Sequence, residues 1–242
     1  MNSLTKLNEK REGGFTLLEL LIVISIIAIL SIALVFMLNP AETLKKARDA
    51  QRISDLKSVK TALGIMLTST STPSLDGTFG ATAATVCSST GNGTAGVGKI
   101  AYSTGTTPTV TSSAAGSDSV ATGPFISASG VSATPGSVNG DGWIPVKLKA
   151  LTGGSPISSF PVDPVNTVTG TAVSTDLVYR YACQNGSLVA SKPAFIFEID
   201  ARLESNAYTV DDTKMTKDGG DNDNYYESGN SLNLLPATVA TF

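Results

Sequence analysis

One glutamate in an otherwise apolar stretch is the residue whose chemistry stands out in this 242-residue chain. From Phe15 to Leu38 there are 24 residues, and Glu19 is the only charged one. A carboxylate in hydrocarbon is costly, with estimates from about 3 to more than 10 kcal/mol. The simplest interpretation is that Glu19 reaches the membrane interface and favours the positive end of a helix dipole. The residues before Glu19 favour a different interpretation.

Gly13 and Gly14 directly precede the apolar stretch, and a polar leader with Lys6, Lys10 and Arg11 precedes them. In an ordinary secretory signal the small residues of the cleavage site follow the apolar segment. Here they come before it. Cleavage at this point would remove only the leader and leave the apolar segment on the mature chain.

Residues 13–20 (Gly-Gly-Phe-Thr-Leu-Leu-Glu-Leu) resemble the class III signal of type IV pilins and type II secretion pseudopilins. The resemblance implies that a prepilin peptidase cuts after Gly14 and that the new N-terminal residue, Phe15, is methylated. It also implies that Glu19 pairs with the Phe15 amine of a neighbouring subunit, which offsets two buried charges and fixes the axial register. The expected processing residues are Gly14 and Phe15, and the expected assembly residue is Glu19.

The same resemblance implies a structural subunit of a type IV pilus-like filament or a type II secretion pseudopilus. The expected partners are other copies of the chain, minor pilins, the prepilin peptidase, an inner-membrane assembly platform, and membrane lipid before assembly. The expected location is the cytoplasmic membrane, followed by an extracytoplasmic or cell-surface filament. No cofactor is implied, and pilus or pseudopilus, and major or minor subunit, stay open.

The apolar stretch is long enough to cross a bilayer, which takes about 20 residues as a helix. The basic leader residues favour a single pass with the N-terminus inside and the C-terminus outside. Asn39-Pro40 then interrupts the pattern. Either the helix kinks at Pro40 and continues, or Asn39 caps a new helix that begins at Pro40. We favour a kink in the free subunit.

Residues 41–67 predict an amphipathic helix whose apolar side packs on a sheet. Its apolar positions recur at spacings of three and four residues: Leu44, Ala47, Ile53, Leu56, Val59, Leu63, Met66 and Leu67. The charged residues between them, such as Asp49 and Arg52, are expected to pair on a solvated face.

The rest of the chain predicts a head with a small antiparallel sheet. Residues 68–140 are rich in Ser, Thr, Gly and Ala and predict an enlarged loop region, whereas residues 177–183 and 195–200 alternate as strands do. The tryptophan Trp143 is expected to anchor the head, and residues 160–166, with Pro161, Asp163 and Pro164, predict a rigid turn. The expected fold is thus α+β, the pilin fold, divided into a leader (1–14), a transmembrane and filament-core helix (15–38), its amphipathic continuation (39–67) and a head (68–242).

The composition excludes several classes of site. The chain has no histidine, so Ser-His-Asp, Cys-His and histidine–zinc sites cannot form. The formal net charge is −3, which gives no electrostatic footprint for nucleic acid across the whole chain. We expect no catalytic residues and no enzymatic activity.

Two further patterns lead to expectations in the head. Cys87 and Cys183 favour a disulfide, because exported domains meet oxidising surroundings, although two free buried thiols stay an alternative. Residues 211–224 hold five aspartates and a Gly-Gly pair. Such a stretch can supply oxygen ligands for calcium, but its spacing does not match an EF-hand, and a solvated loop without metal is preferred.

A function of a different class also fits the sequence. The chain would then be a membrane-tethered, adhesin-like module whose Ser/Thr-rich head binds a surface and which does not polymerise. This alternative predicts no processing at Gly14.

Overall fold

The structure is a computed structural model that describes residues 13–71, 73–75, 87, 99–104, 126–127, 134–168, 175–185 and 195–235. Residues 1–12 of the leader and most of the predicted loop region, 68–140, lie outside them. The chain divides into two compact units, Met1–Thr43 and Leu44–Phe242, and each is described by itself.

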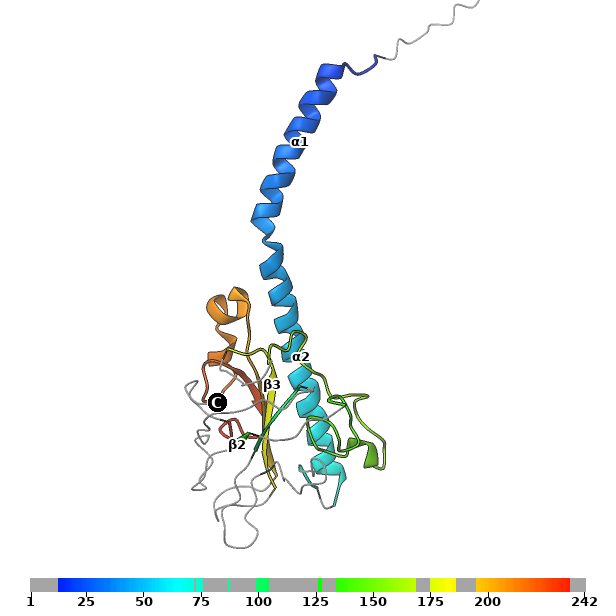
Figure 1. Ribbon diagram of the computed structural model, residues 1–242, viewed down its shortest axis with the longest axis vertical. Coiled ribbons are helices and arrows are strands. Elements are labelled where there is room, and N and C mark those ends of the chain that lie inside the picture. Colours follow the sequence, from blue (N-terminus) through cyan, green and yellow to red (C-terminus); the bar gives the residue numbers. More distant parts are fainter. Residues whose placement is uncertain are drawn as a thin grey trace, which may run out of the picture. The chain divides into compact units, whose positions relative to one another are not determined.

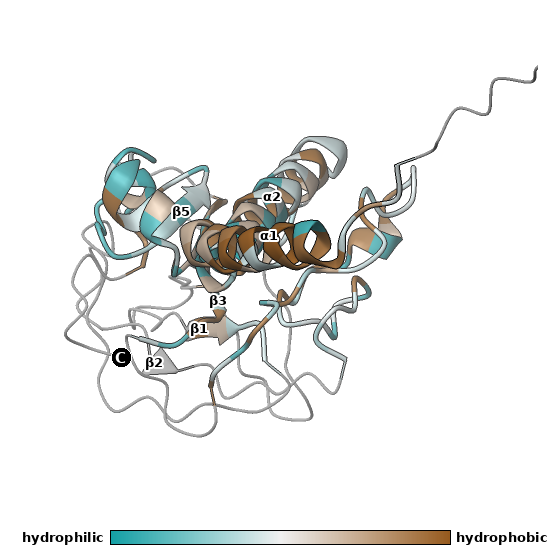
Figure 2. Cartoon of the chain, turned by 90° about the horizontal axis from the view of Figure 1, so that it is seen from above, coloured by the Kyte–Doolittle hydropathy of each residue, from teal (hydrophilic) through white to brown (hydrophobic). Residues whose placement is uncertain are grey.

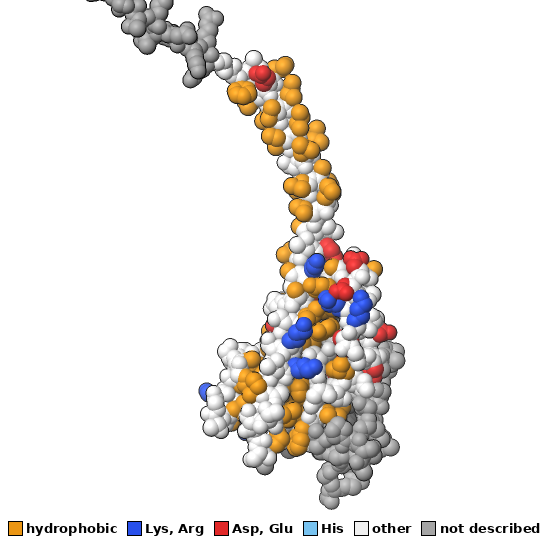
Figure 3. Space-filling model, turned by 180° about the vertical axis from the view of Figure 1, so that it is seen from behind, with side chains coloured by type: hydrophobic (Ala, Val, Ile, Leu, Met, Phe, Trp, Pro, Cys, Tyr) orange, Lys and Arg blue, Asp and Glu red, His pale blue; other side chains and the backbone are white. Residues whose placement is uncertain are grey.

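The first unit is dominated by the helix α1 (Leu17–Leu38), which has no buried residue. Its large apolar side chains are exposed, its ribbon has the hydrophobic colour over most of its length (Figure 2), and hydrophobic side chains lie along the face that Figure 3 shows. Its 22 residues correspond to about 33 Å of helix at 1.5 Å per residue. A helix that is apolar all round and this long satisfies the length and composition of a membrane span.

The helix is interrupted at Asn39, and α2 (Pro40–Ser69) follows. Asn39 adopts a left-handed conformation, with φ 37° and ψ 75°. Its side-chain Oδ1 accepts a hydrogen bond from the backbone N–H of Glu42 at 3.4 Å, and its carbonyl oxygen accepts from Thr43 at 3.2 Å. Pro40 lacks an N–H group, so it fits the first position of a helix. The backbone therefore has the second of the two predicted arrangements, a new helix that Asn39 caps, and the favoured expectation of one kinked helix is corrected.

The head contains a five-stranded sheet in the order β2-β1-β3-β4-β5. In Figure 1 its strand β3 runs beside α2. The strands are β1 (Lys99–Tyr102), β2 (Ile126–Ser127), β3 (Tyr179–Gln184), β4 (Ile196–Ala201) and β5 (Tyr226–Gly229). Strands β1, β3, β4 and β5 are antiparallel neighbours, and only β2 pairs in parallel, with β1. With the long N-terminal helix, this antiparallel sheet confirms the predicted α+β pilin fold.

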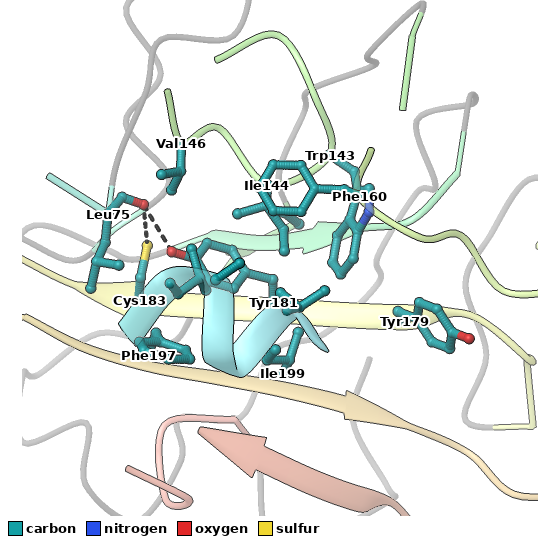
Figure 4. Packing of buried hydrophobic residues seen from close by; sticks show 14 of the residues in the cluster. Leu75, Trp143, Ile144, Val146, Phe160, Tyr179, Tyr181, Cys183, Phe197 and Ile199 are labelled. Carbon is teal, nitrogen blue, oxygen red and sulfur yellow. Dashed lines mark hydrogen bonds between the residues drawn. The ribbon is translucent and has the colours of Figure 1, made fainter. Parts of the chain in front are cut away.

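One face of the sheet packs against α2 to form the main core (Figure 4). The helix contributes Leu56, Val59, Ala62, Leu63 and Met66, all of them buried. The strands contribute the side chains at every second position to the same core, among them Tyr179, Tyr181, Cys183, Phe197 and Ile199. The apolar side of the helix and the apolar residues of the strands thus pack together in one layer, as the spacing of apolar residues in the sequence predicted.

Trp143 anchors a segment without strands at the edge of this core. Its indole Nε1 donates a hydrogen bond to the carbonyl oxygen of Pro161 at 2.8 Å, and its ring is buried. The short 3₁₀ helix η1 (Leu148–Ala150) follows. Residues 143–146 are therefore buried without forming a strand.

The structure joins Cys87 to Cys183 in a disulfide, and both residues are buried. Cys183 lies on β3, beside Tyr181, whose hydroxyl donates to the carbonyl oxygen of Leu75 at 2.9 Å (Figure 4). The bond ties the segment at Cys87 to the centre of the sheet across 96 positions of sequence.

We expect the unfolded full-length chain to react with a thiol reagent only after reduction. Replacing both Cys87 and Cys183 with alanine should lower the free energy of unfolding by about 2–4 kcal/mol, because the crosslink restricts the unfolded chain. Mass spectrometry after alkylation and denaturant titration measure the two effects. Label on the unreduced, unfolded chain would contradict the bond.

Buried structure continues beyond residues 203–205. Strand β5 pairs with β4 beyond that point, and Leu234 and Leu235 are buried in a second cluster on the opposite face of the sheet. Ile100, Val178 and Ile196 belong to the same cluster. The sheet is therefore covered on both faces.

A buried ionic network joins α2 to two distant loops. Arg52, which is fully buried, donates from Nε and Nη2 to both carboxylate oxygens of Asp163 at 2.7 and 3.1 Å. Its Nη1 donates to Asp49 at 2.7 Å and to Glu204 at 2.8 Å. Hydrogen bonds from Arg48 and then Arg52 lower the pKa of Glu204 to about 2, so this carboxylate is charged at neutral pH.

Two sequence-based expectations are corrected by this network. Asp49 and Arg52 do pair, but both are buried and not on a solvated face. Asp163 forms the expected turn, since its Oδ1 accepts from the N–H groups of Val165 and Asn166. The same carboxylate also holds that turn to α2 through Arg52, so the turn is more than a local feature.

Candidate processing and assembly site

The predicted cleavage point lies in extended chain directly before α1. Gly13 and Gly14 are exposed, and no described atom lies within 4 Å of a Cβ built on either of them. Phe15 has 89% of its surface exposed. Among the described residues, nothing covers the bond between Gly14 and Phe15.

The helix then begins with a capping box between Thr16 and Glu19. The backbone N–H of Glu19 donates to Thr16 Oγ1 at 3.2 Å. In return, Glu19 Oε2 accepts from the backbone N–H and the hydroxyl of Thr16, both at 2.9 Å. These bonds satisfy donors that the first helical turn leaves free. They also hold the carboxylate against the helix N-terminus, one turn from Phe15.

The remaining polar side chains of α1 are satisfied within the helix. The hydroxyl of Ser25 donates to the carbonyl oxygen of Leu21 at 2.7 Å, and Ser31 donates to Ile27 at 2.8 Å. Such bonds back to the preceding turn suit a helix in surroundings without water. Glu19 is thus the only ionisable group that α1 brings into an apolar environment.

The structure brings the three predicted residues, Gly14, Phe15 and Glu19, into one short segment, whereas Cys87 and Cys183 lie in the head. Thr16 is a participant that the sequence analysis did not single out. The signal was present, because Thr followed three residues later by Glu is the pattern of a capping box. It was read only as part of the cleavage motif.

The aspartate-rich stretch 211–224 forms no metal centre among the described residues, where no group of three or more Asp, Glu or Cys side chains is placed to hold a metal ion. Part of the stretch is engaged in hydrogen bonds. Asp218, for example, accepts from the backbone N–H groups of Gly220 at 3.0 Å and Glu227 at 2.7 Å. Asp218 therefore organises the turn before β5 instead of lying in a fully solvated loop.

A comparison with protein families finds one match in the chain. Residues 10–35 match the family model described as prokaryotic N-terminal methylation motif. No curated protein and no solved structure matches the chain. The match covers the leader end, the exposed Gly14–Phe15 bond, the capping box and most of α1, so this chain carries the class III signal of type IV pilins and pseudopilins.

Proposed function

We propose that the chain is a structural subunit of a type IV pilus-like filament or type II secretion pseudopilus, cleaved after Gly14 and polymerised through α1. The observation that carries the proposal is the arrangement of residues 13–38: an open peptide bond, then one carboxylate, then an unbroken apolar helix. An anchor alone needs only the last of these. The exposed bond and Glu19 require a further explanation.

Cleavage supplies that explanation, because it creates a free amine on Phe15. When apolar helices pack together, an unpaired ammonium and an unpaired carboxylate are each costly. Glu19 of one subunit beside the Phe15 amine of another removes both costs at one specific axial offset. Before cleavage, the two donors of Thr16 serve the same carboxylate, so the precursor can rest in the membrane as a monomer.

We expect the mature protein to begin at N-methylated Phe15 and to contain 228 residues. Mass spectrometry of the intact protein from its native membrane, with imaging of sheared surface material, measures processing and polymer together. Gly14→Val should block the cut, since a branched side chain hinders close approach of a peptidase to this backbone. The variant should still fold, because the Cβ position at Gly14 is open.

The test also separates this function from the adhesin-like alternative. A mature protein that still begins at Met1 and gives no filaments would contradict the proposal and favour a tethered binding module. Processing at Gly14 without polymer, in cells that hold the assembly platform, would contradict the structural role alone.

A further inference from the structure

A second buried group of charges lies in the head, on the sheet face away from α2. Strand register places Asp200 of β4 between Arg180 of β3 and Glu227 of β5. Glu198, two residues before Asp200, shares the same face. All four side chains are buried, with relative exposures from 0% to 3%. This group therefore contains one cation, Arg180, and three carboxyl groups, all of them buried.

The cation, Arg180, forms a two-point ion pair with Asp200. Arg180 Nε donates to Asp200 Oδ1 at 2.8 Å, and Nη2 forms a second bond with Oδ2. Its guanidinium carbon also lies 3.7 Å from the centre of the Tyr225 ring. This fork-to-fork geometry is the strong form of an arginine–carboxylate pair. Glu198 and Glu227 are left without such a partner.

Glu198 and Glu227 each use one carboxyl oxygen to bind backbone. Glu198 Oε2 accepts from the N–H groups of Leu234 at 2.6 Å and Leu235 at 2.8 Å. Glu227 Oε2 accepts from the N–H group of Asn222 at 3.0 Å. The other oxygen of each, Oε1, is buried and has no donor among the described residues. The register of β4 and β5 makes Glu198 and Glu227 diagonal neighbours on the same face of adjacent strands, a spacing at which long side chains reach one another.

Two carboxylates cannot hydrogen-bond to each other, because both are acceptors only. A proton on one of them supplies the missing donor and removes one of two like charges. The packing is close on the Oε2 side of Glu227, since a Cβ on Gly220 would overlap that oxygen.

We propose that Glu198 and Glu227 share a proton at neutral pH and so form a pH-dependent clasp that holds the segment Leu234–Leu235 on the sheet. Loss of the proton places two negative charges in contact inside the head. The repulsion weakens the two hydrogen bonds that Glu198 accepts from the backbone amides of Leu234 and Leu235. The side chains of these leucines, which are fully buried, are then no longer held on the sheet.

The surroundings support retention of the proton. Burial raises the pKa of Glu198 and of Glu227, and the contact with Glu198 raises that of Glu227 further. Burial also raises the pKa of Asp200 and of Asp218. Neither carboxyl group brings a positive charge that would favour loss of the shared proton. Asp200 is the further charged group that acts on both carboxyl groups, and Arg180 pairs with Asp200 on the same face. Asp218 accepts from the backbone N–H of Glu227, Tyr225 lies against the Arg180 guanidinium, and Tyr102 is opposite Arg180 in the strand register.

A raised carboxyl pKa fixes the sign of the pH dependence. Between the ordinary glutamate value of 4.5 and the folded value, the folded chain binds a proton that the unfolded chain has lost. The contribution to stability is therefore complete below 4.5 and falls as pH rises. Glu204, whose pKa is lowered, acts in the opposite sense and only below 4.5. The two windows do not overlap.

The test compares the full-length chain in detergent with Glu227→Gln, in which an amide N–H takes the place of the shared proton. From about pH 5 to about pH 7, the range between the ordinary glutamate pKa and the raised pKa of Glu198, the folding equilibrium constant of the wild type should fall about tenfold per pH unit more steeply than that of the variant. Over the same range, hydrogen exchange at the Leu234 and Leu235 amides, corrected for its intrinsic rate, should accelerate in the wild type only.

Two further variants complete the design. Glu198→Gln should flatten the profile in the same way, because its amide can also donate across the pair, and it serves if Glu227→Gln does not fold. Asp211→Asn removes an exposed carboxylate and should leave the wild-type slope unchanged. Equal slopes in wild type and both glutamine variants would overturn the proposal. So would failure of both variants to fold, or a slope that an excess of chelator abolishes, since a cation would then occupy the place of the proton.

Discussion

Glu19→Ala should leave cleavage after Gly14 largely intact and abolish filament assembly. The proposed cut lies in the exposed chain before the helix, where Glu19 does not cover the bond. The proposed assembly, by contrast, would bury the Phe15 amine among apolar helices. An ammonium without its partner costs several kcal/mol in such surroundings, which corresponds to at least about a 100-fold loss in the association constant. Filament yield in sheared surface fractions, relative to processed protein in the membrane, measures the effect.

Alanine removes both the charge and the capping box, so two matched variants are needed to separate them. Glu19→Gln keeps an oxygen that accepts from the N–H and hydroxyl of Thr16 but carries no charge. Thr16→Ala keeps the charge and loses the cap, which weakens a helix start by about 0.5–2 kcal/mol. We expect the glutamine variant to fail in assembly and the Thr16 variant to retain it. The reverse result would assign Glu19 to helix capping and not to subunit pairing.

The N-terminal signal could be predicted from sequence because all of its information is local. Gly13-Gly14, Phe15 and Glu19 lie within seven positions, and the apolar helix follows without a gap. The helix α2 and strands β3 and β4 were also predictable, since each places apolar side chains in the main core at the regular spacing of its secondary structure.

The buried charges could not be found in this way. Asp49 and Arg52 sit among solvated charges along α2, and nothing in that stretch distinguishes them. They are buried because Asp163 and Glu204 arrive from more than 100 residues away to complete their hydrogen bonds. A pattern within one helix contains no information about partners that only the fold brings together.

Strand β5 was missed for a related reason. Its sequence, Tyr-Glu-Ser-Gly, has little strand propensity and no apolar alternation. It becomes a strand because β4 offers it an edge, on which Glu227 pairs with Asp200 and Gly229 with Glu198. Gly229 fits there since a Cβ would overlap the carbonyl oxygen of Phe197 on the neighbouring strand. Because the second face of the sheet mixes polar with apolar side chains, the hydropathy pattern of the sequence revealed neither strand β5 nor the final buried segment, Leu234–Leu235.

Arg52→Met should destabilise the head by about 3–5 kcal/mol, the usual cost when one member of a buried ion pair is removed. Methionine retains the apolar stem but leaves Asp163 and Asp49 buried without the guanidinium that joins them. Denaturant titration of the full-length chain in detergent should show a lower midpoint with an unchanged m-value. The turn at Asp163 and the segment at Glu204 should lose hydrogen-exchange protection first, because Arg52 holds both to α2.

Lys60→Met is the matched control, since it removes an exposed cation from the same helix and should change stability by less than about 0.5 kcal/mol. A double-mutant cycle with Asp163→Asn then isolates the pair. Once Arg52 is absent, the second substitution removes a charge that no longer has its partner, so its cost should largely vanish or change sign. Additive losses in the cycle would show that Arg52 and Asp163 stabilise the head independently, and the head would then not depend on a network centred on Arg52.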